Sequence, residues 1–206
     1  MTILAAINAG GLGYYFFADG MEYVVDDLVG IKIFQPADKF EHIDFENGRI
    51  IWGYAGSGER GDIIRDRLAE LRSPDWFDFK NALSAALRGV NEGDGEPLAE
   101  VSVLVGGWLD EEPELFAMDP ASGFYGSHCG VLFIEMNPGD VSGEWCSRHD
   151  SDEADPYEFA RFIESAVSSG QRPNYKLPIR IWHVVSSGYQ RLEIGNGNLV
   201  PQDVAS

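Results

Sequence analysis

The sequence predicts an α+β fold in which antiparallel sheets are covered by helices on their outer faces. The predicted order is a group of strands, two helices, a second group of strands, one helix and a last pair of strands, so strands do not alternate one by one with helices. Several of these segments are apolar at nearly every position, which is typical of strands covered on both faces. The middle of the chain carries two segments with apolar residues at helical spacing. Together these patterns favour sheets between helices over a doubly wound parallel fold.

The first predicted element is a β-hairpin. Residues 2–7 and 14–18 are short apolar runs, and the glycine-rich stretch 8–13 separates them. Further strands are predicted over residues 23–25, 31–34, 40–45 and 49–54. Asn47-Gly48 lies between the last two, and this pair favours a hairpin turn because both residues accept positive φ.

Two amphipathic helices follow these strands. Ile64, Leu68 and Leu71 share one face of a helix predicted from Gly58 to Leu71. Ser73-Pro74 predicts an N-cap and a first-turn proline for the second helix. The apolar face of that second helix is formed by Trp76, Phe79, Leu83, Leu87 and Val90.

The second half of the chain returns to strands, predicted over residues 101–105, 115–118 and 131–134. Residues 137–154 show no clear period and carry an acidic cluster, so we expect a loop there. Asp155-Pro156 predicts the start of a helix that extends through Ala166, with aspartate as its N-cap. A terminal hairpin is predicted over 179–185 and 189–194. We expect one domain over residues 1–206, with a loose tail over 195–206.

Composition restricts the function classes. The chain has 206 residues, a net charge of −19 and 44% hydrophobic residues, so it can bury a sizeable core. The negative charge argues against nucleic acid or an anionic membrane as partner. No apolar run approaches the ~20 residues of a membrane span, and the first residues lack a basic signal region, so we expect a cytoplasmic protein. Cys129 and Cys146 are too few for a disulfide scaffold and are expected to be reduced thiols.

The common motifs of cofactor and metal sites are absent from the sequence. It contains no phosphate-binding loop, no Cys-x-x-Cys pair and no His-Glu-x-x-His. The four histidines are scattered without ligand spacing, so we expect no cofactor and no metal. Thr2 carries a different kind of chemistry, because removal of Met1 would free its α-amino group. An α-amine with a pKa of about 7.7–8.0 can act as base for the hydroxyl of the same residue.

The order of motifs after Thr2 resembles the proteasome β-subunit family of N-terminal-nucleophile hydrolases. Members of that family begin with threonine, and their second strand ends in Ala-Asp, as Phe17-Ala18-Asp19 does here. A lysine then opens a strand, as Lys39 does, and a turn like Ala55-Gly56-Ser57 leads into the first helix. In the second half, Gly106-Gly107-Trp108, the stretch 112–119 and the closing hairpin are similar to family segments.

The resemblance implies a four-layer αββα sandwich and a role for each matched position. Thr2 would be the nucleophile, and Asp19 and Lys39 the charged pair beside it. Gly56 would supply the backbone N–H that binds the oxyanion. Lys32 is a rival to Lys39, although its offset from Gly56 fits less well. The implied reaction is cleavage of peptide or amide bonds through an acyl-enzyme on Thr2, in peptides or unfolded chains if copies of the chain form a ring.

Two family segments are missing, which leaves other functions open. The chain has Cys129-Gly130-Val131 where the family has a Gly-Ser-Gly turn, and Ser168-Ser169-Gly170 lacks the aspartate of the family's Asp-x-x-Ser-Gly. The alternative is therefore an inactive proteasome-like subunit with a structural or interaction role. A third possibility is a small-amide hydrolase that works as a monomer or dimer.

Overall fold

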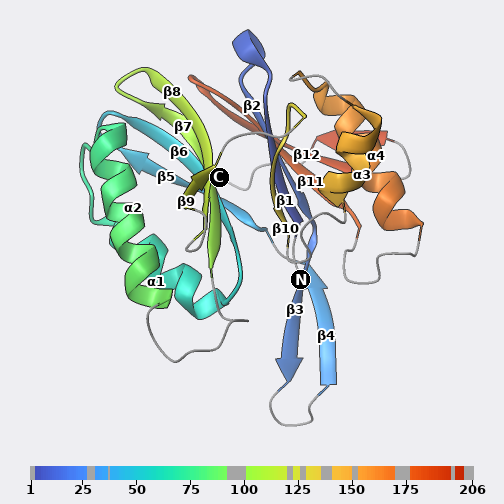
Figure 1. Ribbon diagram of the computed structural model, residues 1–206, viewed down its shortest axis with the longest axis horizontal. Helices are drawn as coiled ribbons and strands as arrows, with labels where there is room; N and C mark the ends of the chain where they lie inside the picture. Colours follow the sequence, from blue (N-terminus) through green and yellow to red (C-terminus); the bar gives the residue numbers. More distant parts are fainter. Residues whose placement is uncertain are drawn as a thin grey trace.

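The fold has four layers, with two sheets packed face to face and a pair of helices on each outer side (Figure 1). This arrangement is seen in a computed structural model of the chain. The structure describes residues 3–26, 31–36, 38–91, 101–119, 123–125, 129–135, 141–149, 153–169, 177–195 and 198–201. The predicted αββα sandwich of antiparallel sheets is confirmed.

One sheet has six strands and the other has five, and each neighbouring pair within them is antiparallel. The order in the six-stranded sheet is β10 (Leu132–Glu135), β1 (Ile3–Asn8), β2 (Tyr14–Asp19), β11 (Ile179–Val185), β12 (Gly188–Gly195) and β13 (Asn198–Pro201). The order in the five-stranded sheet is β5 (Phe40–Phe45), β6 (Gly48–Ala55), β7 (Ser102–Leu109), β8 (Glu112–Asp119) and β9 (Gly123–Tyr125). A separate two-stranded sheet, β3 (Met21–Asp26) and β4 (Ile31–Pro36), extends beyond the four layers (Figure 1).

The helices cover the outer faces of the sheets. They are α1 (Gly58–Ala69), α2 (Trp76–Asn91), α3 (Val141–Arg148) and α4 (Pro156–Ser168), with a short 3-10 helix, η1 (Gly10–Leu12), between β1 and β2. Helices α1 and α2 lie on the five-stranded sheet, and α3 and α4 on the six-stranded sheet (Figure 1). Among the described residues, no helix has the length and apolar character needed to span a membrane.

Strand β1 shows why its sequence is apolar throughout. Ile3, Ala5 and Ile7 face the core under α3 and α4, whereas Leu4 and Ala6 face the core between the two sheets. Because successive side chains of a strand point to opposite faces, a strand between two cores needs apolar residues at every position. The prediction that the first hairpin is covered on both faces is confirmed for β1.

Helix α3 corrects the expectation that residues 137–154 form a loop. Val141 and Trp145 are one helical turn apart, and both are buried under the six-stranded sheet. The Glu135 carboxylate accepts hydrogen bonds from the backbone N–H groups of Val141 and Ser142, at 3.0 and 2.8 Å. A helix held by two apolar residues and a cap from a neighbouring strand has too few apolar positions to show a period.

The expectation of reduced thiols is wrong. Cys129 and Cys146 form a disulfide, with their Cα atoms 5.5 Å apart. The bond joins the turn before β10 to helix α3, where the indole of Trp145 also donates to the carbonyl oxygen of Cys129 at 3.0 Å. The sequence did not indicate this pairing because it depends on α3, which was not predicted.

Two element boundaries also differ from expectation. The N-cap of α2 is Asp75 rather than Ser73, since its carboxylate accepts the N–H of Asp78 at 2.7 Å. Part of the tail predicted to be loose belongs to the six-stranded sheet, because β13 pairs with β12. The N-cap of α4 is as predicted, with Asp155 accepting the N–H of Glu158 at 2.7 Å.

Candidate functional site

The centre of the candidate site is an ion pair between Asp19 and Lys39. Asp19 is the last residue of β2, and Lys39 directly precedes β5 in the opposite sheet. The Lys39 Nζ lies 2.6 Å from Asp19 Oδ1, and the side chains are 7% and 1% exposed. A charged pair this deeply buried needs additional hydrogen bonds to offset the loss of water.

The backbone at the start of β1 supplies one of these hydrogen bonds. The N–H of Ile3 donates to Asp19 Oδ1 at 3.0 Å, so one carboxylate oxygen receives both this amide and the ammonium. The other oxygen, Oδ2, is buried and has no hydrogen-bond partner within the described part of the chain. The end of β2 is held in place by the next residue, because Gly20 N–H donates to the Pro178 carbonyl at 2.8 Å.

The environment of Asp19 acts on its acidity in two directions. Burial raises the pKa of the Asp19 carboxyl above its ordinary value of 3.8, while the Lys39 ammonium and the Ile3 amide act to lower it. Burial is the largest of these influences. A carboxylate with this raised pKa depends on Lys39 to remain ionised.

The start of β5, next to Lys39, lies unusually close to β6. Phe40 pairs with Gly53, and a Cβ atom at Gly53 would lie only 2.7 Å from the Lys39 carbonyl oxygen. Glycine at position 53 therefore permits the approach. Lys32, the rival in the sequence, lies in β4, where it pairs with Val25 of β3.

Gly56 lies at the junction of β6 and α1. Its φ of 128° falls in the region that favours glycine, and the residue is exposed. The preceding Ala55 belongs to the same core cluster as Ala18 and Phe40, which directly adjoin Asp19 and Lys39. The segments that carry the three predicted positions thus converge in one core. The fourth position, Thr2, lies outside the described residues, as does Met1.

Three residues beside the pair were not predicted. Asp38 accepts a hydrogen bond from the Trp182 indole and forms an ion pair with Arg191. Both contacts join residues that are far apart in the chain, and the tryptophan and the aspartate are separated by 144 positions. No local pattern marks such a contact, so only the folded arrangement reveals it.

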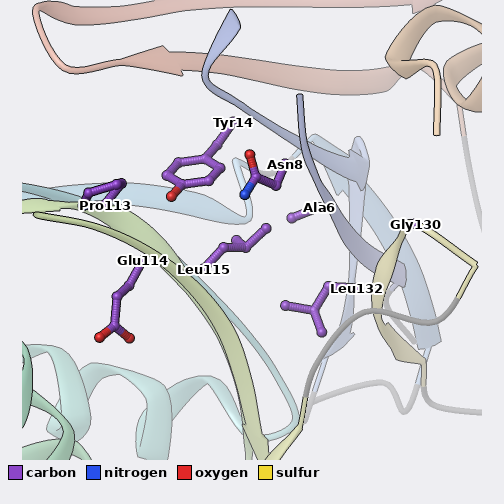
Figure 2. A pocket seen from close by; sticks show the side chains of 8 residues that line it. All are labelled: Ala6, Asn8, Tyr14, Pro113, Glu114, Leu115, Gly130 and Leu132. Atoms are coloured by element: carbon purple, nitrogen blue, oxygen red, sulfur yellow. The ribbon is translucent and has the colours of Figure 1, made fainter. Parts of the chain in front are cut away.

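A cavity of about 450 Å³ opens at the opposite end of the sandwich. It is lined near the end of β1 by Ala6 and Asn8, whereas the ion pair lies at the beginning of that strand. In Figure 2, the Glu114 carboxylate points away from Asn8 and the ring of Tyr14, and Glu114 pairs instead with Lys80 of α2. Burial raises the pKa of the Tyr14 hydroxyl, and the charge of Glu114 adds to this effect. The cavity is therefore a feature separate from the Asp19–Lys39 pair.

No protein-family model matches the chain, and no curated protein does either. Solved structures, however, share its fold. A Gly-1 mutant of Anbu from Hyphomicrobium sp. strain MC1 aligns over 95% of this chain and 89% of its own, with a TM-score of 0.70 and 16% identity. Anbu from Yersinia bercovieri, described as an ancestral beta-subunit, aligns over 92% and 86%, with a TM-score of 0.66 and 14% identity. A helical assembly of the Anbu complex from Pseudomonas aeruginosa aligns over 98% and 88%, with a TM-score of 0.63 and 16% identity.

These structures correct the resemblance drawn from the sequence. The motif order indicated the proteasome β-subunit family, but the structural neighbours carry a different family name, Anbu. The reason is that the order of a few short motifs indicates an architecture and does not decide between families that share it. At identities of 14–16%, the similarity establishes the fold. The chain has the four-layer fold of Anbu, the ancestral beta-subunit.

Proposed function

We propose that this protein is an N-terminal-threonine hydrolase that cleaves peptide or amide bonds. Thr2 is the nucleophile once Met1 has been removed, and its own α-amine is the general base. Asp19 and Lys39 are the charged pair beside it, and the N–H of Gly56 binds the oxyanion. The substrates are peptides or unfolded protein segments.

The observation that carries this proposal is the pair of contacts at Asp19 Oδ1. That oxygen receives the ammonium of Lys39 at 2.6 Å and the N–H of Ile3 at 3.0 Å. Ile3 is joined to Thr2 by a single peptide bond, so the buried charge pair is anchored one residue from the proposed nucleophile. The hydrogen bond that helps to compensate the buried charge thus also holds the start of β1 beside the pair.

The reaction balances with groups that belong to the chain, the substrate and water. The Thr2 oxygen attacks the carbonyl carbon, and its proton passes to the α-amine while the Lys39 ammonium stabilises the developing negative charge. Collapse of the tetrahedral intermediate breaks the carbon–nitrogen bond, and the α-amine returns the proton to the leaving amine. Water then hydrolyses the ester on Thr2 and releases a carboxylic acid.

Mass spectrometry tests the nucleophile directly. We expect the native protein to lack Met1 and to gain the mass of an epoxyketone or β-lactone probe on Thr2. Thr2→Ala should abolish labelling and amide hydrolysis, whereas the matched variant Thr2→Ser should retain part of both. An intact Met1 on protein purified from its native source, with no labelling, would refute the proposal.

A second candidate is a non-catalytic subunit with a structural or interaction role. It is favoured by the sequence at two places, because Cys129-Gly130 and Ser168-Ser169-Gly170 lack the serine-bearing turn and the Asp-x-x-Ser-Gly of catalytic relatives. Loss of amide hydrolysis on Thr2→Ala would rule out this candidate. A folded protein without hydrolysis and without labelling would support it.

The proposed hydrolase also associates with copies of itself. The Pseudomonas aeruginosa structure of the same fold is a helical assembly, and we propose a homo-oligomer, as a ring or a helix, for this chain. Mass photometry distinguishes such an oligomer from the monomer or dimer of a small-amide hydrolase.

A further inference from the structure

Asp38 is bound on two sides by residues of the six-stranded sheet. Its Oδ1 accepts the indole N–H of Trp182 at 3.2 Å, and its Oδ2 lies 2.8 Å from Nη1 of Arg191. Together with Arg180 and Glu193, these three residues border a cavity of about 170 Å³. Both oxygens of one carboxylate are therefore engaged, and by two different strands.

The groups that hold Asp38 are themselves fixed. Trp182 of β11 and Arg191 of β12 are direct cross-strand partners. The guanidinium lies 4.0 Å from the centre of the Trp182 ring, a distance that allows a cation–π contact. The ring of Tyr189 is stacked on that of Trp182, with the ring centroids 5.0 Å apart, and Trp182 is only 1% exposed. The anchor for Asp38 is thus a packed part of the sheet.

The segment that Asp38 anchors carries Lys39. Residues 38 and 39 precede β5, whose first ladder pair is Phe40 with Gly53. Phe40 is buried between the sheets, with its ring 5.3 Å from that of Phe16. Lys39 therefore lies between two fixed points, Phe40 on its C-terminal side and Asp38 on its N-terminal side.

We propose that Asp38 is a positioning residue, and that its clamp on Trp182 and Arg191 holds the Lys39 ammonium against Asp19. The proposal deepens the hydrolase function above and rests on it for its catalytic consequence. A lysine side chain has several rotatable bonds and loses rotamer freedom when it is ordered. Fixing the backbone at its base reduces the positions that the ammonium can reach.

The expected effect on the reaction follows from the precision that catalysis needs. A displacement of ~1 Å can lower a rate on the order of 10²-fold. We expect Asp38→Ala to lower kcat for amide hydrolysis, and the rate of β-lactone labelling, by about tenfold or more. KM should change much less, because Asp38 holds Lys39 and does not bind substrate.

Nuclear magnetic resonance of the lysine side chains tests the clamp without reference to activity. The lysines of this chain are Lys32, Lys39, Lys80 and Lys176, so the spectrum is simple, and Lys39→Arg assigns the relevant signal. In the wild-type protein, Lys39 should show a protected ammonium with a distinct shift. In Asp38→Ala that signal should move toward the value of an exposed lysine, and the Trp182 indole signal should shift with it.

Four further variants separate positioning from general stability. Glu193→Gln breaks the ion pair with Arg180 on the same two strands without touching Asp38, so it should leave the Lys39 signal and the labelling rate nearly unchanged. Asp38→Asn keeps an acceptor for Trp182 but loses the charge for Arg191, so its effect should be intermediate. Arg191→Lys should keep more of the wild-type labelling rate than Arg191→Gln, because an ammonium retains the positive charge that pairs with Asp38. The unfolding free energy of each variant shows whether the loss of rate exceeds the loss of folded protein.

The outcomes distinguish the two proposals. If the Lys39 signal is unchanged in Asp38→Ala while the Trp182 signal shifts, the clamp is overturned, whatever the activity. If the wild-type protein is neither labelled nor active but Lys39 responds to Asp38→Ala, the hydrolase function fails and the positioning stands. If labelling falls equally in Glu193→Gln and Asp38→Ala, the effect is general and the positioning role is refuted.

Discussion

At the scale of the single residue, the buried Asp19–Lys39 pair matters for stability as well as for the proposed reaction. Both side chains are almost fully buried, so each charge depends on the other. Replacing such a pair by apolar groups is often neutral, whereas removing one partner leaves an uncompensated buried charge. A double-mutant cycle on the free energy of unfolding is therefore the strongest test of the pair.

We expect Lys39→Met to lower the free energy of unfolding by about 3–5 kcal/mol at neutral pH. Without the ammonium that lowers it, the pKa of the Asp19 carboxyl rises further above its value in the unfolded chain. A raised folded-state pKa means that stability is lost as the pH rises through it, so the deficit should shrink on acidification. Urea denaturation at a series of pH values measures this dependence.

The double variant and a surface lysine provide the controls. Asp19→Asn combined with Lys39→Met should recover most of the loss and remove the extra pH dependence. Lys80 pairs with Glu114 at sites that are about one-third exposed, so Lys80→Met should cost roughly 1 kcal/mol or less. A Lys39→Met deficit that did not vary with pH would contradict an ionised Asp19 as its source.

A second residue-scale prediction compares two buried tryptophans. Trp52 and Trp145 are each 1% exposed, but their indole N–H groups differ. Trp145 donates to the Cys129 carbonyl at 3.0 Å, whereas the N–H of Trp52 has no partner among the residues that the structure describes. Both changes to phenylalanine remove similar volume, so Trp145→Phe should be less stable than Trp52→Phe by about 1–3 kcal/mol. Equal losses in thermal or chemical denaturation would contradict this difference.

At the scale of the element, the sequence predicts best where a single element shows its own period. The apolar faces of α2 and α4 and the Asn47-Gly48 turn between β5 and β6 were all found from local pattern. Helix α3 was missed because its stability comes from outside it, through the cap from Glu135 and the disulfide of Cys146. Elements stabilised by distant groups carry no local signal of their own.

The disulfide gives the element-scale prediction. Cys129 and Cys146 are 17 residues apart, and a loop of that length restricts the unfolded chain by about 3 kcal/mol. Replacing both with alanine should lower the free energy of unfolding by about that amount. Hydrogen exchange should show the greatest loss of protection in α3. The alanine variant should be insensitive to reductant, whereas equal stability of wild-type protein with and without reductant would contradict a structural role for the bond.

At the scale of the whole molecule, antiparallel sheets covered by helices followed from the sequence and the four layers from the resemblance, but the site followed only in part. The pairing of Asp19 with Lys39 was expected by position along the chain, through a resemblance and not through any local pattern. The contacts of Asp38 with Trp182 and Arg191 were not expected, since they join the segment before β5 in one sheet to β11 and β12 in the other. The order of motifs predicted that Asp19 and Lys39 lie close together. It did not predict which other side chains hold them in place.

The net charge of −19 leads to a prediction about assembly. Copies that carry this charge repel one another, and salt shortens the range of the repulsion from about 30 Å at 0.01 M to about 3 Å at 1 M. If the protein forms the proposed homo-oligomer, the assembled fraction should increase steeply with sodium chloride at fixed protein concentration. Mass photometry or sedimentation velocity measures that fraction. Sucrose at equal osmolality should have little effect, because it does not screen charge. A monomer at every salt concentration would rule out the oligomer. An oligomer that dissociates as salt is added would contradict the expected salt dependence, because it would show that attraction between charged groups controls assembly.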